Sequence, residues 1–200
     1  MAPRRSVPQA ERRQELLAAA RDVFTRKGYH AATVDDITRA AGVAKGTFYL
    51  YFDEKREVFS ELVRGFLEQI GALVRSVASG TPDDFMDRAR QAAHDLMRLF
   101  LDNREMARLA YRESMGLDRE LETMVRAFYR DIAEIEAANV RRGIELGVFR
   151  SVNPLVVAYA HIGMVERVLL ELLDEDTPLP PPDVIVGEVL GLALEGLLRR

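Results

Sequence analysis

Apolar residues recur every three or four positions along almost the whole chain, which is the spacing of one face of an α-helix. Leu16, Ala20, Val23 and Phe24 follow this spacing, and Gly28 then supplies a typical C-terminal helix signal. Alternating strand patterns are nearly absent. The pattern predicts an all-α protein of about nine helices, at roughly residues 9–27, 33–41, 44–50, 53–79, 82–102, 103–114, 118–146, 154–174 and 183–200.

The stretch GVAKGTFYLYFDEK, residues 42–55, places four aromatic rings within five positions. No single helix face can bury all of them, because successive helical residues point in different directions. We expect Phe48 to point inward and Phe52 to close the joint with the next helix, as core residues. Tyr49 and Tyr51 are expected to stay outside, with hydroxyl groups available to phosphate oxygens.

Two short helices joined at Gly42 form the helix-turn-helix pattern, whose second helix can enter the major groove of DNA. Thr33 is expected to cap the first of them, with Asp36 three residues on. Gly46 lets the backbone approach DNA, while Thr47 offers a methyl and a hydroxyl group. The expected DNA contacts are Thr33, Lys45, Gly46, Thr47, Phe48, Tyr49, Tyr51 and Lys55, the last pairing with a phosphate.

Residues 28–59, GYHAATVDDITRAAGVAKGTFYLYFDEKREVF, closely resemble the DNA-binding segment of the tetracycline-repressor (TetR/AcrR) family. The resemblance implies a ligand-controlled transcriptional regulator, with a repressor favoured, that acts as a homodimer on a palindromic operator. It also implies a DNA-binding domain at residues 1–52 and a helical effector-binding and dimerisation domain at 53–200. Ala44 departs from the family pattern, which often has Ser there, and so removes a possible helix cap.

The last two expected helices, at about 154–174 and 183–200, are apolar on more than one face. A helix with two apolar faces must bury both, so one face needs a partner. We expect these helices to form a four-helix interface in a two-fold dimer. The alternative is a thick core within a single subunit.

The effector implied by the resemblance is a small apolar or amphipathic molecule bound among the fourth to seventh helices. Its candidate contacts lie at helical spacing, which is also typical of plain core residues. Asn139 and Arg142 continue an apolar stripe, so they meet a ligand or a dimer partner, or mark where the stripe surfaces. The expected ligand contacts are Phe66, Ile70, Met97, Phe100, Tyr111, Met124, Phe128 and Asn139, with Met106, Leu109 and Ile132 as further candidates.

The net charge of −4 conceals an asymmetry along the chain. Residues 1–60 hold 11 Lys and Arg against 8 Asp and Glu, or +3, so residues 61–200 hold 17 against 24, or −7. All three lysines lie in the first segment. The asymmetry is consistent with a small module that faces an anion, attached to an acidic body.

Other functional classes find little support in the sequence. There is no cysteine, which excludes disulfides and thiolate metal sites, and we expect no metal and no cofactor. Common hydrolase, metalloprotease and nucleotide-binding motifs are missing, so we expect no enzyme. The start lacks a signal-peptide pattern and no membrane segment is expected, which favours the cytoplasm. An all-helical enzyme and a helical interaction module remain as alternatives.

Overall fold

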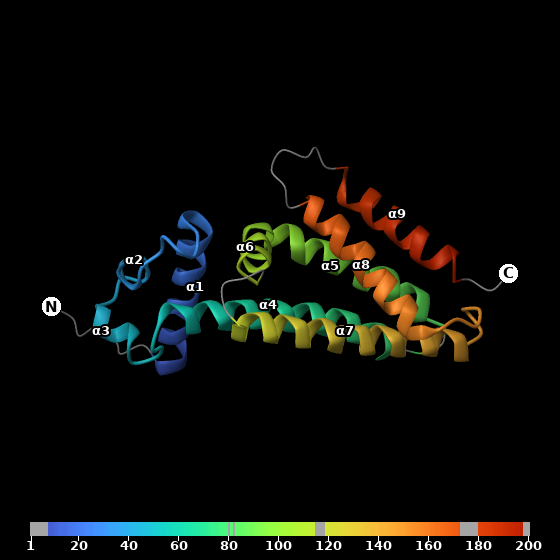
Figure 1. The fold of residues 1–200 in the computed structure, drawn as a ribbon, viewed down its shortest axis with the longest axis horizontal. Helices are drawn as coiled ribbons and strands as arrows, with labels where there is room; N and C mark the ends of the chain where they lie inside the picture. Colours follow the sequence, from blue (N-terminus) through green and yellow to red (C-terminus); the bar gives the residue numbers. More distant parts are fainter. Residues whose placement is uncertain (1–7, 80, 82, 115–118, 173–179, 198–200) are drawn as a thin grey trace.

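The computed structural model describes residues 8–79, 81, 83–114, 119–172 and 180–197. Within these residues the regular structure consists of nine α-helices and one short 3-10 helix (Figure 1). The helices are α1 (Gln9–Lys27), α2 (Val34–Ala40), α3 (Lys45–Phe48), α4 (Lys55–Ser76), α5 (Phe85–Asp102), α6 (Arg104–Ser114), α7 (Arg119–Glu145), α8 (Pro154–Leu172) and α9 (Pro182–Glu195), and the 3-10 helix Val77–Ser79 extends α4. The all-α prediction is confirmed.

The first three helices gather at one end of the molecule, and α4 leads from them into a larger body (Figure 1). In that body α4 runs beside α7, and α7 packs extensively against α8. Helix α5 contacts α4 on one side and α9 on the other. This arrangement makes α4 the element that the small helical group and the body share.

A core of aromatic and aliphatic side chains holds the first three helices together. Phe24, Ile37 and Phe48 are fully buried, and Phe52 joins them from the turn before α4. The same core continues into α4, α6 and α7 through Val58, Phe59, Val63, Met106, Leu109, Ala110 and Leu121. The predicted division at residues 52 and 53 is therefore crossed by one continuous set of buried contacts.

Some helix ends differ from the sequence expectation. Helix α3 has a single regular turn, because after Phe48 the chain continues in turns, in which the Tyr51 and Phe52 amides donate to the Phe48 carbonyl. Helix α4 begins at Lys55 with Glu54 at its N-cap, two residues after the expected start at residue 53. The Asp53 amide instead donates to the Glu57 carboxylate at 2.8 Å, so the side chain of Glu57 satisfies the backbone just ahead of the helix.

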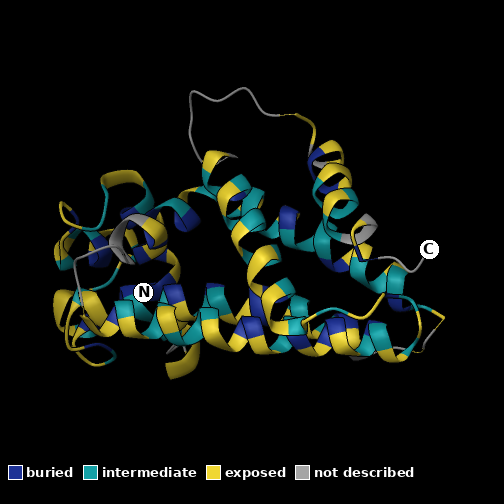
Figure 2. Cartoon of the chain, turned by 45° about the vertical axis from the view of Figure 1, so that its right-hand side comes forward, coloured by how far each residue is buried: buried dark blue, intermediate teal, exposed yellow. Residues whose placement is uncertain are grey.

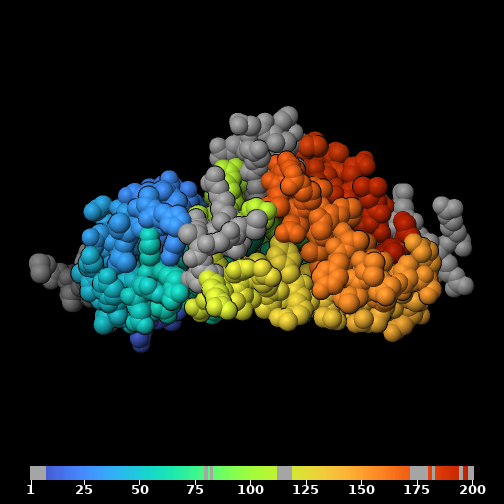
Figure 3. Space-filling model, viewed as in Figure 1, coloured from blue at the N-terminus to red at the C-terminus, as the bar shows by residue number. Residues whose placement is uncertain are grey.

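Helices α8 and α9 expose large apolar side chains. They lie side by side on the face seen in Figure 3, and exposed positions recur along both in Figure 2. Asn153 caps α8, since its Oδ1 accepts from the Leu155 and Val156 amides at 3.1 and 3.2 Å. The exposed apolar residues of the two helices include Leu155, Val156, Tyr159, Val184 and Leu192.

Candidate nucleic-acid interface and internal cavity

A capping box fixes the start of α2. The Thr33 hydroxyl accepts from the Asp36 amide at 3.1 Å, and the Asp36 carboxylate accepts from the Thr33 amide at 3.1 Å. Lys27, at the end of α1, donates to the same carboxylate at 2.6 Å. The hydrogen bond from Lys27, followed by that from Thr33, lowers the Asp36 pKa from 3.8 to about 2. The cap expected at Thr33 is confirmed.

The turn between α2 and α3 depends on Gly42, whose φ of 66° lies in the left-handed region. The Val43 amide donates back to the Thr38 carbonyl at 3.0 Å, which closes the turn. Ala44 then occupies the N-cap of α3 in an extended conformation and provides no side-chain hydrogen bond. Helix α3 is therefore held by its packing and not by a hydroxyl cap.

Packing sets which face of α3 points outward. Phe48 has no exposed surface and anchors α3 in the core, so it cannot contact DNA directly and its place among the expected contacts is corrected to that of an anchor. Tyr49 is 51% exposed, while Tyr51 is half-buried against the core. Lys45 and Gly46 are exposed and Thr47 is half-buried. A Cβ added at Gly46 would meet nothing within 4 Å, so this backbone is open to a partner.

Leu50 is a surface residue that the sequence reasoning missed. It is 74% exposed and directly follows Tyr49 beyond the end of α3. Its position four residues after Gly46 was the available signal, because residues four apart share a helix face. An exposed leucine beside an exposed tyrosine adds an apolar group to the polar groups on the surface around α3.

Lys55 has a different environment from the one expected. Its ammonium donates to the carbonyls of Tyr29, His30 and Ala32 at 2.8, 3.2 and 2.8 Å, and lies 4.7 Å from the centre of the Tyr29 ring. An ammonium has three N–H donors, and all three are used here. Lys55 thus ties the loop between α1 and α2 to the start of α4, where a phosphate contact was expected.

Lys45 remains at the surface. Its ammonium lies 2.9 Å from the Asp35 carboxylate, and this hydrogen bond raises the Lys45 pKa above its ordinary value of 10.5. An exposed ion pair of this kind contributes little to the stability of the fold, so Lys45 can exchange Asp35 for another anion at little cost. Lys45 therefore keeps an exposed charge, paired only with an exposed carboxylate.

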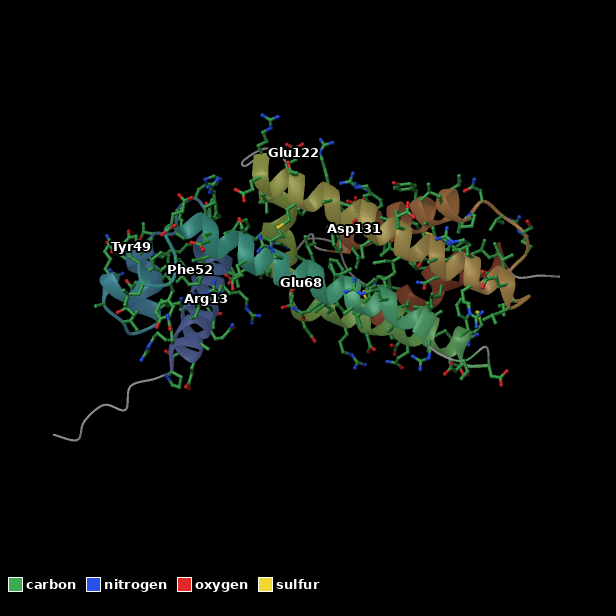
Figure 4. The ribbon with its side chains drawn as sticks, turned by 90° about the horizontal axis from the view of Figure 1, so that it is seen from below. Arg13, Tyr49, Phe52, Glu68, Glu122 and Asp131 are labelled. Atoms are coloured by element: carbon green, nitrogen blue, oxygen red, sulfur yellow. The ribbon has the colours of Figure 1, made fainter. Side chains whose placement is uncertain are left out.

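A second joint connects α1 to α4. The Arg13 guanidinium donates two hydrogen bonds to the Glu61 carboxylate and lies 4.6 Å from the centre of the Phe52 ring. Figure 4 shows Arg13 and Phe52 close together, with Tyr49 at the outer edge of the same end. The hydrogen bond to Glu61 raises the Arg13 pKa. Together with Lys55, this pair fixes the orientation of the first three helices on α4.

The body encloses a largely apolar cavity of about 640 Å³. Its walls come from α4 to α9, and Phe66 and Phe100 pack together in this lining with ring centres 5.3 Å apart. A volume of this size is typical of sites for small organic ligands. Of the expected ligand contacts, the structure brings six to the cavity wall: Phe66, Ile70, Phe100, Tyr111, Phe128 and Asn139.

The other expected contacts lie elsewhere. Met97 is buried in a cluster with Leu169 of α8 and Ile185 and Val186 of α9, and it is not part of the cavity wall. Met124 packs against the core of the first helices, outside the cavity wall. Arg142 lies near the surface, where it forms an ion pair with Glu145 at 3.5 Å.

One wall of the cavity carries polar groups that the sequence reasoning had not assigned to it. The Tyr129 hydroxyl of α7 donates to the Glu166 carboxylate of α8 at 2.7 Å, and the Tyr129 pKa is raised mainly by burial and then by this carboxylate. Two turns further along α7, Glu136 lies 3.0 Å from His161 Nδ1 of α8. The partner of His161 thus lies within its own subunit.

Asn139 completes this polar wall and is only 4% exposed. Its amide nitrogen donates to the Val74 carbonyl at 3.0 Å and to Glu136 at 3.2 Å, which fixes the orientation of the amide. No donor among the described residues reaches its Oδ1. Within the part of the chain that the structure describes, no cluster of three His, Asp or Glu suits a metal ion.

Known proteins match the chain along nearly its whole length. The profile for bacterial regulatory proteins of the tetR family matches residues 16–62, and that for the tetracyclin repressor-like C-terminal domain matches residues 82–170. The transcriptional repressor KstR2 of Mycobacterium tuberculosis is 30% identical over 196 residues, covering 94% of each chain. The chain belongs to the tetR family.

Other members of the tetR family agree with this assignment. The uncharacterized regulator YdgC of Bacillus subtilis is 27% identical over 194 residues, covering 95% of this chain and 94% of its own. A TetR/AcrR regulator from Thermobifida fusca superposes with a TM-score of 0.73 at 26% identity, over 94% and 99% of the two chains. SmeT in complex with triclosan shares the fold, with a TM-score of 0.78 at 24% identity over 96% and 93%. The protein is a helix-turn-helix transcriptional regulator.

Proposed function

We propose that this tetR-family regulator is a repressor that binds a palindromic operator as a homodimer and is released by a small apolar or amphipathic effector. The observation that supports this proposal most directly is the orientation of α3. Its buried Phe48 turns Lys45, Gly46 and Tyr49 outward at the end of the molecule. The KstR2 relatives are named as repressors, which supports the sign of regulation. The site of action is the cytoplasm, where the operator DNA would lie.

The exposed face of α3 is the proposed base-reading surface. Lys45 and Tyr49 approach phosphates, while Gly46, Thr47 and the neighbouring Leu50 meet the floor and wall of the major groove. Thr33 and the N-terminus of α2 face a phosphate on the adjoining strand, and Tyr51 supports Tyr49 from its half-buried position. Phe48 and Lys55 act by holding these groups in place.

Dimerisation is proposed through α8 and α9, whose exposed apolar residues would be covered by the same helices of a second copy. Two copies present two α3 helices, and half-sites one helical turn of DNA apart, ~34–36 Å, would be read together. The effector is proposed to bind in the cavity. Helix α4 contributes Phe66 and Ile70 to that cavity and Glu61 to the joint with Arg13, so a shift of α4 would move α3.

Fluorescence anisotropy with the DNA upstream of the protein's own gene tests the proposal. We expect selective binding over a scrambled duplex, with affinity that falls steeply as salt rises, because phosphate contacts release counterions. Tyr49→Ala should weaken binding at least tenfold, whereas Tyr49→Phe, which keeps the ring, should weaken it less. Equal affinity for both duplexes, unaffected by Tyr49→Ala, would instead favour the helical interaction module.

A further inference from the structure

The lining of the cavity carries more negative than positive charge. Its acidic and basic side chains are those of Glu122, Arg126 and Glu136 on α7 and of His161 and Glu166 on α8, interspersed with apolar residues of the same helices. Arg126 is engaged by Glu122 at 2.6 Å, and its side chain is 77% exposed. Glu136 and Glu166 remain, and no Lys or Arg among the described residues forms an ion pair with either.

The two remaining glutamates differ in how far their oxygens are used. Glu136 uses both, since one lies 3.0 Å from His161 Nδ1 and the other accepts from the Asn139 amide at 3.2 Å. In Glu166 only Oε1 is used, and it accepts from the Tyr129 hydroxyl at 2.7 Å. Oε2 of Glu166 has no partner among the described residues and is not an enclosed atom, so it can accept from a ligand.

The surroundings of Glu166 suit a positive charge. The side chain is half-buried, so less water screens its charge than at an exposed site. Tyr129, which holds Oε1, has the Phe128 ring 5.8 Å away between ring centres, and both residues line the cavity. The faces of aromatic rings attract cations. The carboxylate and the rings therefore favour the same kind of ligand group.

An anionic head group finds no free counter-charge in this lining. It would meet the carboxylates of Glu136 and Glu166, and Arg126 could bind it only by leaving Glu122. Repulsion between like charges is strong where water is scarce, so a carboxylate or phosphate is disfavoured. A neutral head group avoids this repulsion but gains no attraction from the charge of Glu166.

We propose that the effector of this regulator is an amphipathic cation, an ammonium group on an apolar body, which forms an ion pair with Glu166. The inference rests on the proposed function, since it specifies the ligand of the same cavity. The ammonium donates to Oε2 of Glu166, while Tyr129 keeps Oε1 in place. The apolar body packs against the aromatic and aliphatic side chains that make up most of the lining. Glu166 thereby selects cations over neutral or anionic molecules of the same shape.

Isothermal titration calorimetry with the full-length protein tests this selection. Three probes share one alkyl chain and differ in charge: decylamine, which is protonated at neutral pH, neutral 1-decanol and anionic decanoate. We expect the wild-type protein to bind decylamine most tightly. Glu166→Gln keeps the side-chain size and an acceptor for Tyr129 but removes the charge. It should raise the Kd for decylamine about tenfold and that for 1-decanol by less than about twofold, because the lost attraction is between charges.

Glu134→Gln is the matched control. Glu134 is an exposed residue of α7 outside the cavity lining, so its substitution changes the net charge equally and leaves the cavity unaltered. Neither Kd should change. An equal effect of the two glutamine substitutions would overturn the inference, as would an equal change for both probes, or none, in Glu166→Gln. Tighter binding of decanoate than of decylamine to the wild-type protein, or no binding of decylamine, would overturn it as well.

A crystal structure of the wild-type protein with decylamine tests the same contact without a variant. The inference requires the ammonium nitrogen at ~2.8 Å from a Glu166 carboxylate oxygen, and a nitrogen directed elsewhere refutes it. Failure of the proposed function looks different. In that case decylamine binds with the expected dependence on Glu166, but the complex with operator DNA persists when the cavity is saturated.

Discussion

Lys55 illustrates how a single side chain can serve DNA binding without touching DNA. Its three hydrogen bonds hold the loop that leads into α2, and α2 in turn supports α3. Lys55→Met should lower the free energy of unfolding by about 2 kcal/mol, because charged hydrogen bonds are lost and carbonyls are left without a partner. Urea denaturation followed by circular dichroism measures this change.

Lys45→Met is the matched control for Lys55→Met. Lys45 forms only an exposed ion pair, so its loss should leave the urea midpoint nearly unchanged. If Lys45 contacts a phosphate, the slope of log K against log salt should fall in magnitude by about 0.9 in Lys45→Met and stay constant in Lys55→Met. The reverse pattern would return Lys55 to the DNA contacts.

Sequence reasoning placed both lysines on the same side of the molecule but could not separate their roles. The lysine at 55 was assigned to a phosphate because it opens a helix near the recognition segment. Its actual partners are backbone carbonyls 23 to 26 residues earlier. Because every residue has a backbone carbonyl, the sequence does not indicate which ones accept a hydrogen bond. The inward position of Phe48, by contrast, followed from helical periodicity alone.

The Asp36 carboxylate at the start of helix α2 makes the stability of the fold depend on pH. The folded-state pKa of Asp36, about 2, lies below its ordinary value of 3.8. The ionised carboxylate therefore stabilises the fold above about pH 4, and this contribution is lost as the pH falls toward 2. Asp36→Asn should destabilise the protein at pH 5 and make progressively less difference between pH 4 and pH 2, as measured by urea denaturation.

Thr33→Ala provides an independent check on the same element. The Thr33 hydroxyl donates to the Asp36 carboxylate at 2.8 Å, so its removal should raise the Asp36 pKa measured by NMR titration. It should also cost about 1 kcal/mol of stability through loss of the cap. An Asp36 pKa that stays near 2 in Thr33→Ala would show that Lys27 alone sets it.

Helix boundaries show where sequence patterns are informative. Helix α1 runs over Gln9–Lys27, as predicted, because the apolar spacing and Gly28 agree on its end. The bounds of α3 and the start of α4 differ from the prediction by one or two residues, since turns and the Glu57 side chain satisfy the backbone hydrogen bonds there. The polar wall was missed because Tyr129, Glu136, His161 and Glu166 read separately as ordinary helix residues and become a group only when α7 packs on α8.

Across the whole molecule, α4 is the physical link between cavity and DNA-binding end. Its N-terminal half lies in the core shared with α1 to α3, and its later turns line the cavity. If a ligand favours one position of α4 and DNA favours another, each weakens the binding of the other by the same free energy, typically 1–3 kcal/mol. Asn139 of α7 lines the cavity, and its amide donates to the Val74 carbonyl of α4, so the cavity wall and this link meet at one residue.

The proposed assembly of two molecules can be tested at the exposed apolar residues of α8 and α9. Val156 and Leu192 are 65% and 72% exposed, so Val156→Glu with Leu192→Glu should leave the folded subunit intact and give a monomer in sedimentation velocity. Operator affinity should fall at least tenfold, because two half-sites are no longer read together. Leu50→Glu alters an equally exposed leucine, 74%, in the DNA-binding end, and should weaken DNA binding while the dimer persists. A dimer that survives both glutamates would place the interface on another face.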